Sequence, residues 1–198
     1  RNAYLRQTQA QQQQTLGLLQ QQMANQTPAQ QQETRQRIVD MIEDQGLEAF
    51  EYSTRLGLSA AFAMAQSLKV EKRYGEPGVM VILSSIYGLV GPQPSLYEGI
   101  DHISQASAGY AAAKAGQIGL VRYLASVMGP NIRVNGLIPG GLLRGQPEEF
   151  VRRYSERTPL GRMGTEDDLR GAIAFLCTDM SAYVTGQVLQ VDGGWTIW

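Results

Sequence analysis

The chain is poor in cysteine and histidine, and its positive and negative charges nearly cancel. One cysteine among 198 residues excludes an intrachain disulfide framework and favours a reducing compartment. The formal net charge of −1 gives no basic footprint for nucleic acid. No apolar run approaches the ~20 residues that span a bilayer, and the Gln-rich N-terminal stretch lacks a signal-peptide pattern. We therefore expect a cytoplasmic globular protein with neither a nucleic-acid nor a membrane partner.

Metal-binding patterns are also missing, because no group of His, Cys, Asp and Glu has the spacing of metal ligands. No metal site is therefore predicted. The only histidine, His102, is expected to be a solvated loop residue, since a lone loop histidine is rarely a ligand or base. Cys177 is expected to be a buried core thiol.

A tyrosine and a lysine four residues apart form the most informative pattern in the chain. Tyr110 and Lys114 flank three alanines, so a helix would place the phenol and the ammonium on one face. An ammonium beside a tyrosine stabilises the phenolate, which lets the tyrosine act as an acid or base near neutral pH. The apolar run 78–83 suits a strand buried on both faces, and it ends in Ser84 and Ser85. Together these side chains predict redox chemistry on a C–O bond.

The order of predicted elements indicates an α/β fold. Strands are predicted at 78–83, 131–137 and 188–191, and helices at 27–46, 52–72, 109–128, 147–155 and 165–177. Strands alternating with helices predict a parallel sheet with right-handed crossovers. We expect a Gln-rich helical segment over 1–46 and one α/β domain over 47–198.

Several short motifs follow the Tyr–Lys pair in order. They are Ile-Arg-Val-Asn at 132–135, Pro-Gly at 139–140, Pro-Leu-Gly-Arg at 159–162, Tyr-Val-Thr-Gly-Gln at 183–187 and Val-Asp-Gly-Gly at 191–194. With these motifs, the chain from about residue 52 to 198 resembles the short-chain dehydrogenase/reductase family. The loop 85–88 and the ending Gly-Gly-Trp look most like members associated with surface-sugar biosynthesis.

The resemblance implies a Rossmann-like doubly wound parallel sheet that binds NAD or NADP. It implies an oxidoreductase that acts on a secondary alcohol or ketone, in a sugar-related small molecule, and assembles as a homodimer or homotetramer. Trp195 and Trp198 are then expected at a subunit interface.

The resemblance also implies site residues. Tyr110 would be the catalytic acid/base, and Lys114 would stabilise its phenolate and hold the nicotinamide ribose. Ser85 would position the substrate oxygen, with Ser84 as its rival for that role.

On the cofactor side, the resemblance implies that the backbone around Pro139, Gly140 and Leu142 would line the nicotinamide pocket.

The chain departs from the family pattern at three points. It contains no Thr-Gly-x-x-x-Gly-x-Gly turn, which brings the backbone close to a pyrophosphate. It also has no Asn-Asn-Ala-Gly strand. Where the family carries an asparagine on a long helix, the spacing here lands on Gly57. In addition, the loop before Tyr110 is long, and residues 92–107 are expected to shape the substrate pocket.

Two accounts of these departures stay open. In one, the βαβ portion before the Gln-rich helices is missing from this stretch of chain, and the enzyme is an ordinary one. In the other, Gln-rich helices replace that portion, and the protein is a non-catalytic accessory or scaffold subunit that retains the fold. The second account leaves an exposed edge strand that another surface must cover.

Overall fold

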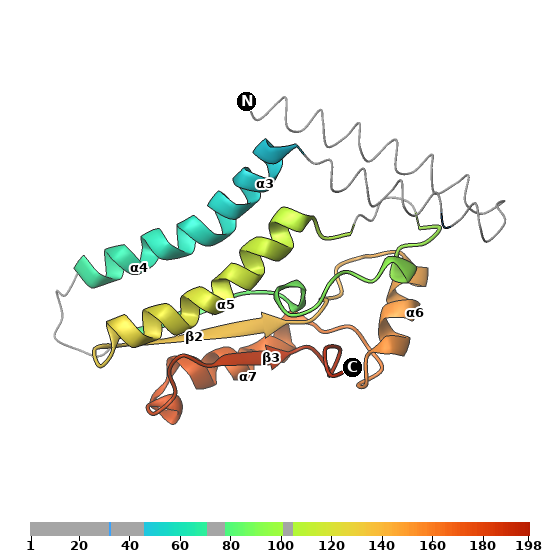
Figure 1. Ribbon diagram of the computed structural model, residues 1–198. Coiled ribbons are helices and arrows are strands. Elements are labelled where there is room, and N and C mark those ends of the chain that lie inside the picture. The colour runs from blue at the N-terminus through green and yellow to red at the C-terminus, as the bar shows by residue number, and fades with distance from the viewer. Residues whose placement is uncertain (1–31, 33–45, 71–77, 101–104) are drawn as a thin grey trace.

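The structure, a computed structural model of the 198-residue chain, describes residues 32, 46–70, 78–100 and 105–198 (Figure 1). The predicted Gln-rich segment over 1–46 lies outside the described residues except at 32 and 46, and so does His102.

Among the described residues, three parallel strands form one sheet in the order β1-β2-β3. They are β1 (Gly78–Leu83), β2 (Ile132–Pro139) and β3 (Val188–Val191). The three predicted strands are confirmed, and β2 runs two residues further than expected, to Pro139. Leu83 lies opposite Leu137, and Leu137 lies opposite Leu189, so the three strands end at one edge of the sheet.

A long helix precedes β1 and is divided by a π-helical turn. It consists of α3 (Leu47–Thr54), the π turn η1 (Arg55–Ser59) and α4 (Ala60–Val70). The helix predicted at 52–72 therefore begins five residues earlier, directly after Gly46. Gly46 has an extended ψ of 148° and serves as the N-cap of this helix.

The remaining helices agree with the predicted ones to within two residues at each end. They are α5 (Ala108–Met128), α6 (Glu148–Arg157) and α7 (Glu166–Cys177). The start of α7 is fixed by Asp168, whose carboxylate accepts hydrogen bonds from the Thr165 N–H and hydroxyl at 2.7 and 2.9 Å.

Helices cover both faces of the sheet (Figure 1). Helix α5 packs on one face and α7 on the other, while α3 and α4 lie along α5, and Ala65 of α4 joins the buried cluster between α5 and the sheet. This three-layer arrangement is the doubly wound α/β class that the sequence predicts.

No helix among the described residues is both long enough and apolar enough to cross a membrane.

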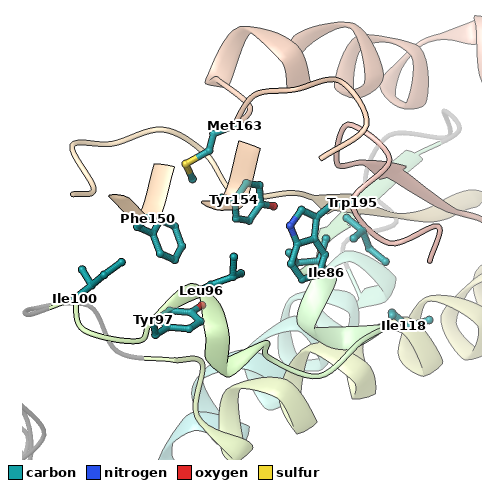
Figure 2. Packing of buried hydrophobic residues seen from close by; sticks show 10 residues of the cluster. Ile86, Leu96, Tyr97, Ile100, Ile118, Phe150, Tyr154, Met163 and Trp195 are labelled. Carbon is teal, nitrogen blue, oxygen red and sulfur yellow. The ribbon is translucent and has the colours of Figure 1, made fainter. Parts of the chain in front are cut away.

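In the described part of the chain, apolar side chains form two buried clusters. One lies between the sheet and α5, and includes Val121, Leu124 and Val134. The other joins the segment after β1 to α6 and the C-terminal turn, and Figure 2 shows its aromatic members. This second cluster supports the short segment that directly follows Ser85, because Ile86 belongs to it.

Two expectations about single residues are wrong. Trp195 is only 1% exposed and stacks on Tyr154 inside this chain, with ring centroids 5.5 Å apart (Figure 2). The cause is Asp192, whose carboxylate accepts from the N–H groups of residues 194 and 196 and so turns the chain back over its own core. Cys177 is exposed, because it follows the buried Leu176 and points about 100° away around the helix.

Candidate active site

The hydroxyl groups at the end of β1 serve different partners. Ser84 donates its hydroxyl hydrogen to the backbone carbonyl of Lys114 at 2.7 Å, which ties the strand end to α5. The hydroxyl of Ser85 accepts from the Tyr87 N–H at 3.2 Å. An accepting hydroxyl keeps its own hydrogen for another partner. Ser84 is thus used within the fold, whereas Ser85 can still donate.

Tyr110 lies in the first turn of α5. Ser107 caps this helix, and its hydroxyl accepts from the Tyr110 N–H at 3.1 Å. Because the cap starts the helix before Tyr110, helix periodicity places Tyr110 and Lys114 on one face. The Lys114 ammonium lies 5.5 Å from the centre of the Tyr110 ring, as the four-residue spacing predicts. Tyr110 as a whole residue is 39% exposed, so a ligand can approach it.

The Lys114 ammonium is held against the end of β1. It donates to the carbonyl of Leu83 at 2.8 Å and to the side-chain oxygen of Gln117 at 3.3 Å. Burial lowers the pKa of this lysine below its usual 10.5, because desolvation disfavours the charged form. An ammonium has three N–H donors, so a third hydrogen remains for a ligand hydroxyl or for the phenolate.

The loop after Ser85 touches α5 so closely that residue 88 must be glycine. A Cβ at Gly88 would lie 2.9 Å from the backbone C and O of Lys114 and 3.0 Å from the Ser84 hydroxyl. Real Cβ atoms essentially never approach other atoms so closely. The short helix η2 (Ile86–Gly88) is therefore fixed against the turn of α5 that carries Lys114.

The end of β2 lies beside the end of β1. Leu137 pairs with Leu83. Pro139, the last residue of β2, and Ser85, two residues past the end of β1, therefore lie at corresponding positions of the two segments. Gly140 donates its N–H to the Val191 carbonyl at 3.0 Å, and a Cβ there would lie 2.8 Å from the Asp192 Cα. The expected cofactor-lining backbone at Pro139 and Gly140 is thus at the same sheet edge as Ser85.

Leu142 lies beyond this edge in a bridge to a later loop. It pairs with Gly164, and the Gly141 N–H donates to the Tyr154 hydroxyl at 2.6 Å. These bonds hold the backbone after Pro139 in a defined course.

Tyr97, from the segment that the sequence predicts to shape the pocket, meets Tyr87 of the loop after Ser85. The hydroxyls of Tyr87 and Tyr97 are 2.6 Å apart. Burial raises the pKa of both above the usual 10, so both are protonated at neutral pH. Tyr87 is two residues from Ser85, so the pair links the loop that follows the candidate serine to the segment around Tyr97.

Gln117 is the polar residue that sequence reasoning missed. It follows Lys114 by three residues, a spacing that places two side chains on one helix face. It is 5% exposed and contacts the ammonium directly. The three-residue spacing from Lys114 could have indicated Gln117, but a glutamine on a helix is commonly solvated.

Among the described residues, no group of three or more His, Cys, Asp or Glu could hold a metal ion.

Comparison with known proteins places the chain in a family. Residues 7–196 match a family model described as enoyl-(acyl carrier protein) reductase, which is of the short-chain dehydrogenase type. The chain is 36% identical over 159 residues to an L-rhamnose 1-dehydrogenase (NAD(P)(+)) from Sphingomonas sp. (strain SKA58), covering 76% of this chain and 58% of that protein. It is also 36% identical over 152 residues to a 3alpha-hydroxysteroid dehydrogenase from Mediterraneibacter gnavus, covering 74% and 56%.

A solved structure agrees with these relatives. The chain is similar to a short chain dehydrogenase from Leptospira borgpetersenii with bound NAD+, at a TM-score of 0.71 and 37% identity. That likeness covers 78% of this chain and 59% of the other. The chain therefore belongs to the short-chain dehydrogenase/reductase family and has its Rossmann-like fold. It spans less than two thirds of the length of these relatives.

Proposed function

We propose that this chain is the catalytic part of an NAD(P)-dependent oxidoreductase that interconverts a secondary alcohol and a ketone. The observation that carries the proposal is the shared face of Tyr110 and Lys114 at the carboxyl end of β1, beside Ser85. Ligands of open α/β sheets bind outside the carboxyl ends of the strands. Both named relatives are dehydrogenases, which supports the same reaction class.

Each of the three side chains has one task in this reaction. In the oxidation direction, Tyr110 accepts the proton of the substrate hydroxyl as a phenolate, and in reduction the phenol returns it. Lys114 stabilises the phenolate through its positive charge. Ser85 donates its hydroxyl hydrogen to the substrate oxygen and so holds that oxygen near the phenol. Fixing these groups in one geometry supplies much of the rate effect.

The described residues fit the nicotinamide end of NAD or NADP. Lys114 has a third N–H hydrogen for a ribose hydroxyl, and the strand ends at Pro139 and Gly140 stand beside Ser85. Leu142, three residues beyond Pro139, would line the same side. A bound nicotinamide supplies or accepts the hydride at the substrate carbon.

The substrate is proposed to be a sugar-related small molecule. One relative is named for L-rhamnose, which supports a sugar-related alcohol as the substrate. The other relative is named for a hydroxysteroid, so the substrate panel must include both kinds of alcohol.

A cytoplasmic location and a homodimer or homotetramer complete the proposal. The single cysteine supports the location. Exposed apolar side chains along the long helix support self-association, and they include Leu47, Leu56, Met64 and Leu68. Light scattering on the purified protein measures the assembly; a monomer at all concentrations would contradict it.

Titration with NADH and NADPH tests the cofactor claim. The full polypeptide is expected to change the nicotinamide fluorescence on binding at least one of the two. The Lys114→Met variant is expected to bind more weakly, because it loses the ammonium that would donate to the ribose. If the wild-type chain produces no change with either cofactor, the enzyme proposal fails and the non-catalytic scaffold takes its place.

A further inference from the structure

Gln117 is a buried amide that connects two elements. Its side-chain nitrogen donates to the Gly57 carbonyl of the π turn at 2.7 Å, and its oxygen accepts from the Lys114 ammonium at 3.3 Å. Because a carbonyl can only accept and an ammonium can only donate, these partners fix which end of the amide faces which. Both ends of this 5%-exposed side chain are therefore used.

The π turn explains why the Gly57 carbonyl can take this bond. A π turn shifts the backbone hydrogen bonding of a helix by one residue and is frequent at functional sites. Gly57 also lets the turn approach α5, because a Cβ at this position would lie 3.0 Å from the Cβ of Ala113. The same close packing continues one turn later, where a Cβ at Gly116 would lie 2.9 Å from Leu58. The carbonyl is thus held within reach of Gln117.

Lysine needs such a contact to be held in one position. Its four-carbon stem is flexible and its ammonium has three rotating donors. The Leu83 carbonyl fixes one of these donors from the strand side, and Gln117 fixes a second from the helix side. With two donors fixed, the direction of the third is also determined.

From this geometry we infer that Gln117 is a positioning residue for Lys114. It links the ammonium to the Gly57 carbonyl of the π turn and thereby aims the remaining N–H donor toward the ligand side of Tyr110. The catalytic purpose of this positioning rests on the proposed function. The geometry itself can be measured without any turnover.

The test uses the ammonium signal of Lys114 in nitrogen-15 NMR spectra of the full chain, with a Lys114→Met variant to assign the signal. In the wild type, a doubly hydrogen-bonded ammonium exchanges slowly with water. Gln117→Met, which has similar size and no amide, is expected to speed this exchange about tenfold because one charge-assisted bond is lost. An unchanged exchange rate in a folded Gln117→Met variant would overturn the inference.

A second variant separates positioning from simple structural support. Gln117→Glu keeps an acceptor for Lys114 but cannot donate to Gly57. Its Lys114 signal is expected to persist with a shifted frequency, because a carboxylate replaces the amide oxygen. If Gln117→Glu gives the wild-type signal, the amide does not hold the ammonium, even when the Met variant fails to fold. If the NMR experiments give the expected results but the chain fails to bind a nicotinamide cofactor, the proposed function is contradicted. The positioning role of Gln117 would then still hold.

Discussion

At the scale of single residues, Lys114 contacts several parts of the candidate site. Its backbone carbonyl accepts from Ser84, and its ammonium contacts the Leu83 carbonyl, Gln117 and the Tyr110 ring. The lysine therefore joins the end of β1 to the helix that carries the phenol. Its charge is stabilising for a phenolate only while the ammonium keeps its proton.

The lowered pKa of Lys114 predicts an alkaline limit to activity. The ammonium is present below its pKa in the folded protein and is lost as the pH rises through that value. Because burial sets this pKa below 10.5, kcat/KM is expected to fall at a lower pH than a free lysine would give. The profile of kcat/KM against pH measures the position of the fall.

Arginine at the same place provides the control for this pH dependence. The guanidinium of Lys114→Arg stays protonated over the whole range, so the variant is expected to be slower but to lose the alkaline fall. The same fall in Lys114→Arg would show that another group causes it.

Much of the site could be predicted from residue types and spacing. The four-residue interval between Tyr110 and Lys114 predicts their shared face, because helix periodicity is local. The division of roles between Ser84 and Ser85 depends on which hydroxyl meets α5, and no local pattern contains that contact. The burial of Gln117 depends likewise on packing between helices that lie far apart in the sequence.

At the scale of elements, close helix and loop contacts hold the site together. Glycines at 57, 88, 109 and 116 each stand where a Cβ would meet another element at 3.0 Å or less. The sequence predicts the strands and helices well because their apolar runs and caps are local. It could not predict the π turn, because a mid-helix glycine at 57 is compatible with an ordinary helix.

Adding one methyl group at the loop after β1 is expected to disturb the site. Gly88→Ala places a Cβ 2.9 Å from the Lys114 backbone, so η2 and α5 must separate. Such overpacking is expected to lower the free energy of unfolding by about 1–3 kcal/mol and to reduce cofactor binding. Chemical denaturation and the nicotinamide titration measure the two effects.

Gly91→Ala is the matched control, because no atom lies within 4 Å of a Cβ added there. The control is expected to match the wild type in both measurements. Equal stability of the two alanine variants would contradict the close contact at Gly88.

At the scale of the whole molecule, the two edges of the described sheet differ. At the β3 edge, the side chain of Asn135 in β2 makes two hydrogen bonds. It is fully buried, donates to the Val184 carbonyl at 2.9 Å and accepts from the Gln187 N–H at 3.1 Å. These bonds attach the segment before β3 to the central strand. Among the described strands, β1 forms the other edge of the sheet. This is the edge that the second sequence-based account leaves to be covered by another surface.

Loss of the Asn135 amide is expected to destabilise the entire fold. Asn135→Ala removes a fully buried side chain together with its bonds to the Gln187 N–H and the Val184 carbonyl, which costs about 1–3 kcal/mol of unfolding free energy. Thermal unfolding followed by circular dichroism measures the change. Asn131→Ala, at an exposed position just before β2, is the control and should melt like the wild type. Similar melting of both variants would contradict a structural role for the Asn135 side chain.

The central claim is that Tyr110 transfers the proton during NAD(P)-dependent oxidation or reduction. Its most direct measurement is the formation of reduced nicotinamide by the full polypeptide, with NAD or NADP and a panel of sugar and steroid secondary alcohols. Tyr110→Phe keeps the ring and removes the hydroxyl. We predict turnover by the wild type and a loss of about 10²-fold or more in the variant, with nicotinamide binding retained. Turnover by Tyr110→Phe at the wild-type rate, or none by a wild type that binds the cofactor, would contradict this claim.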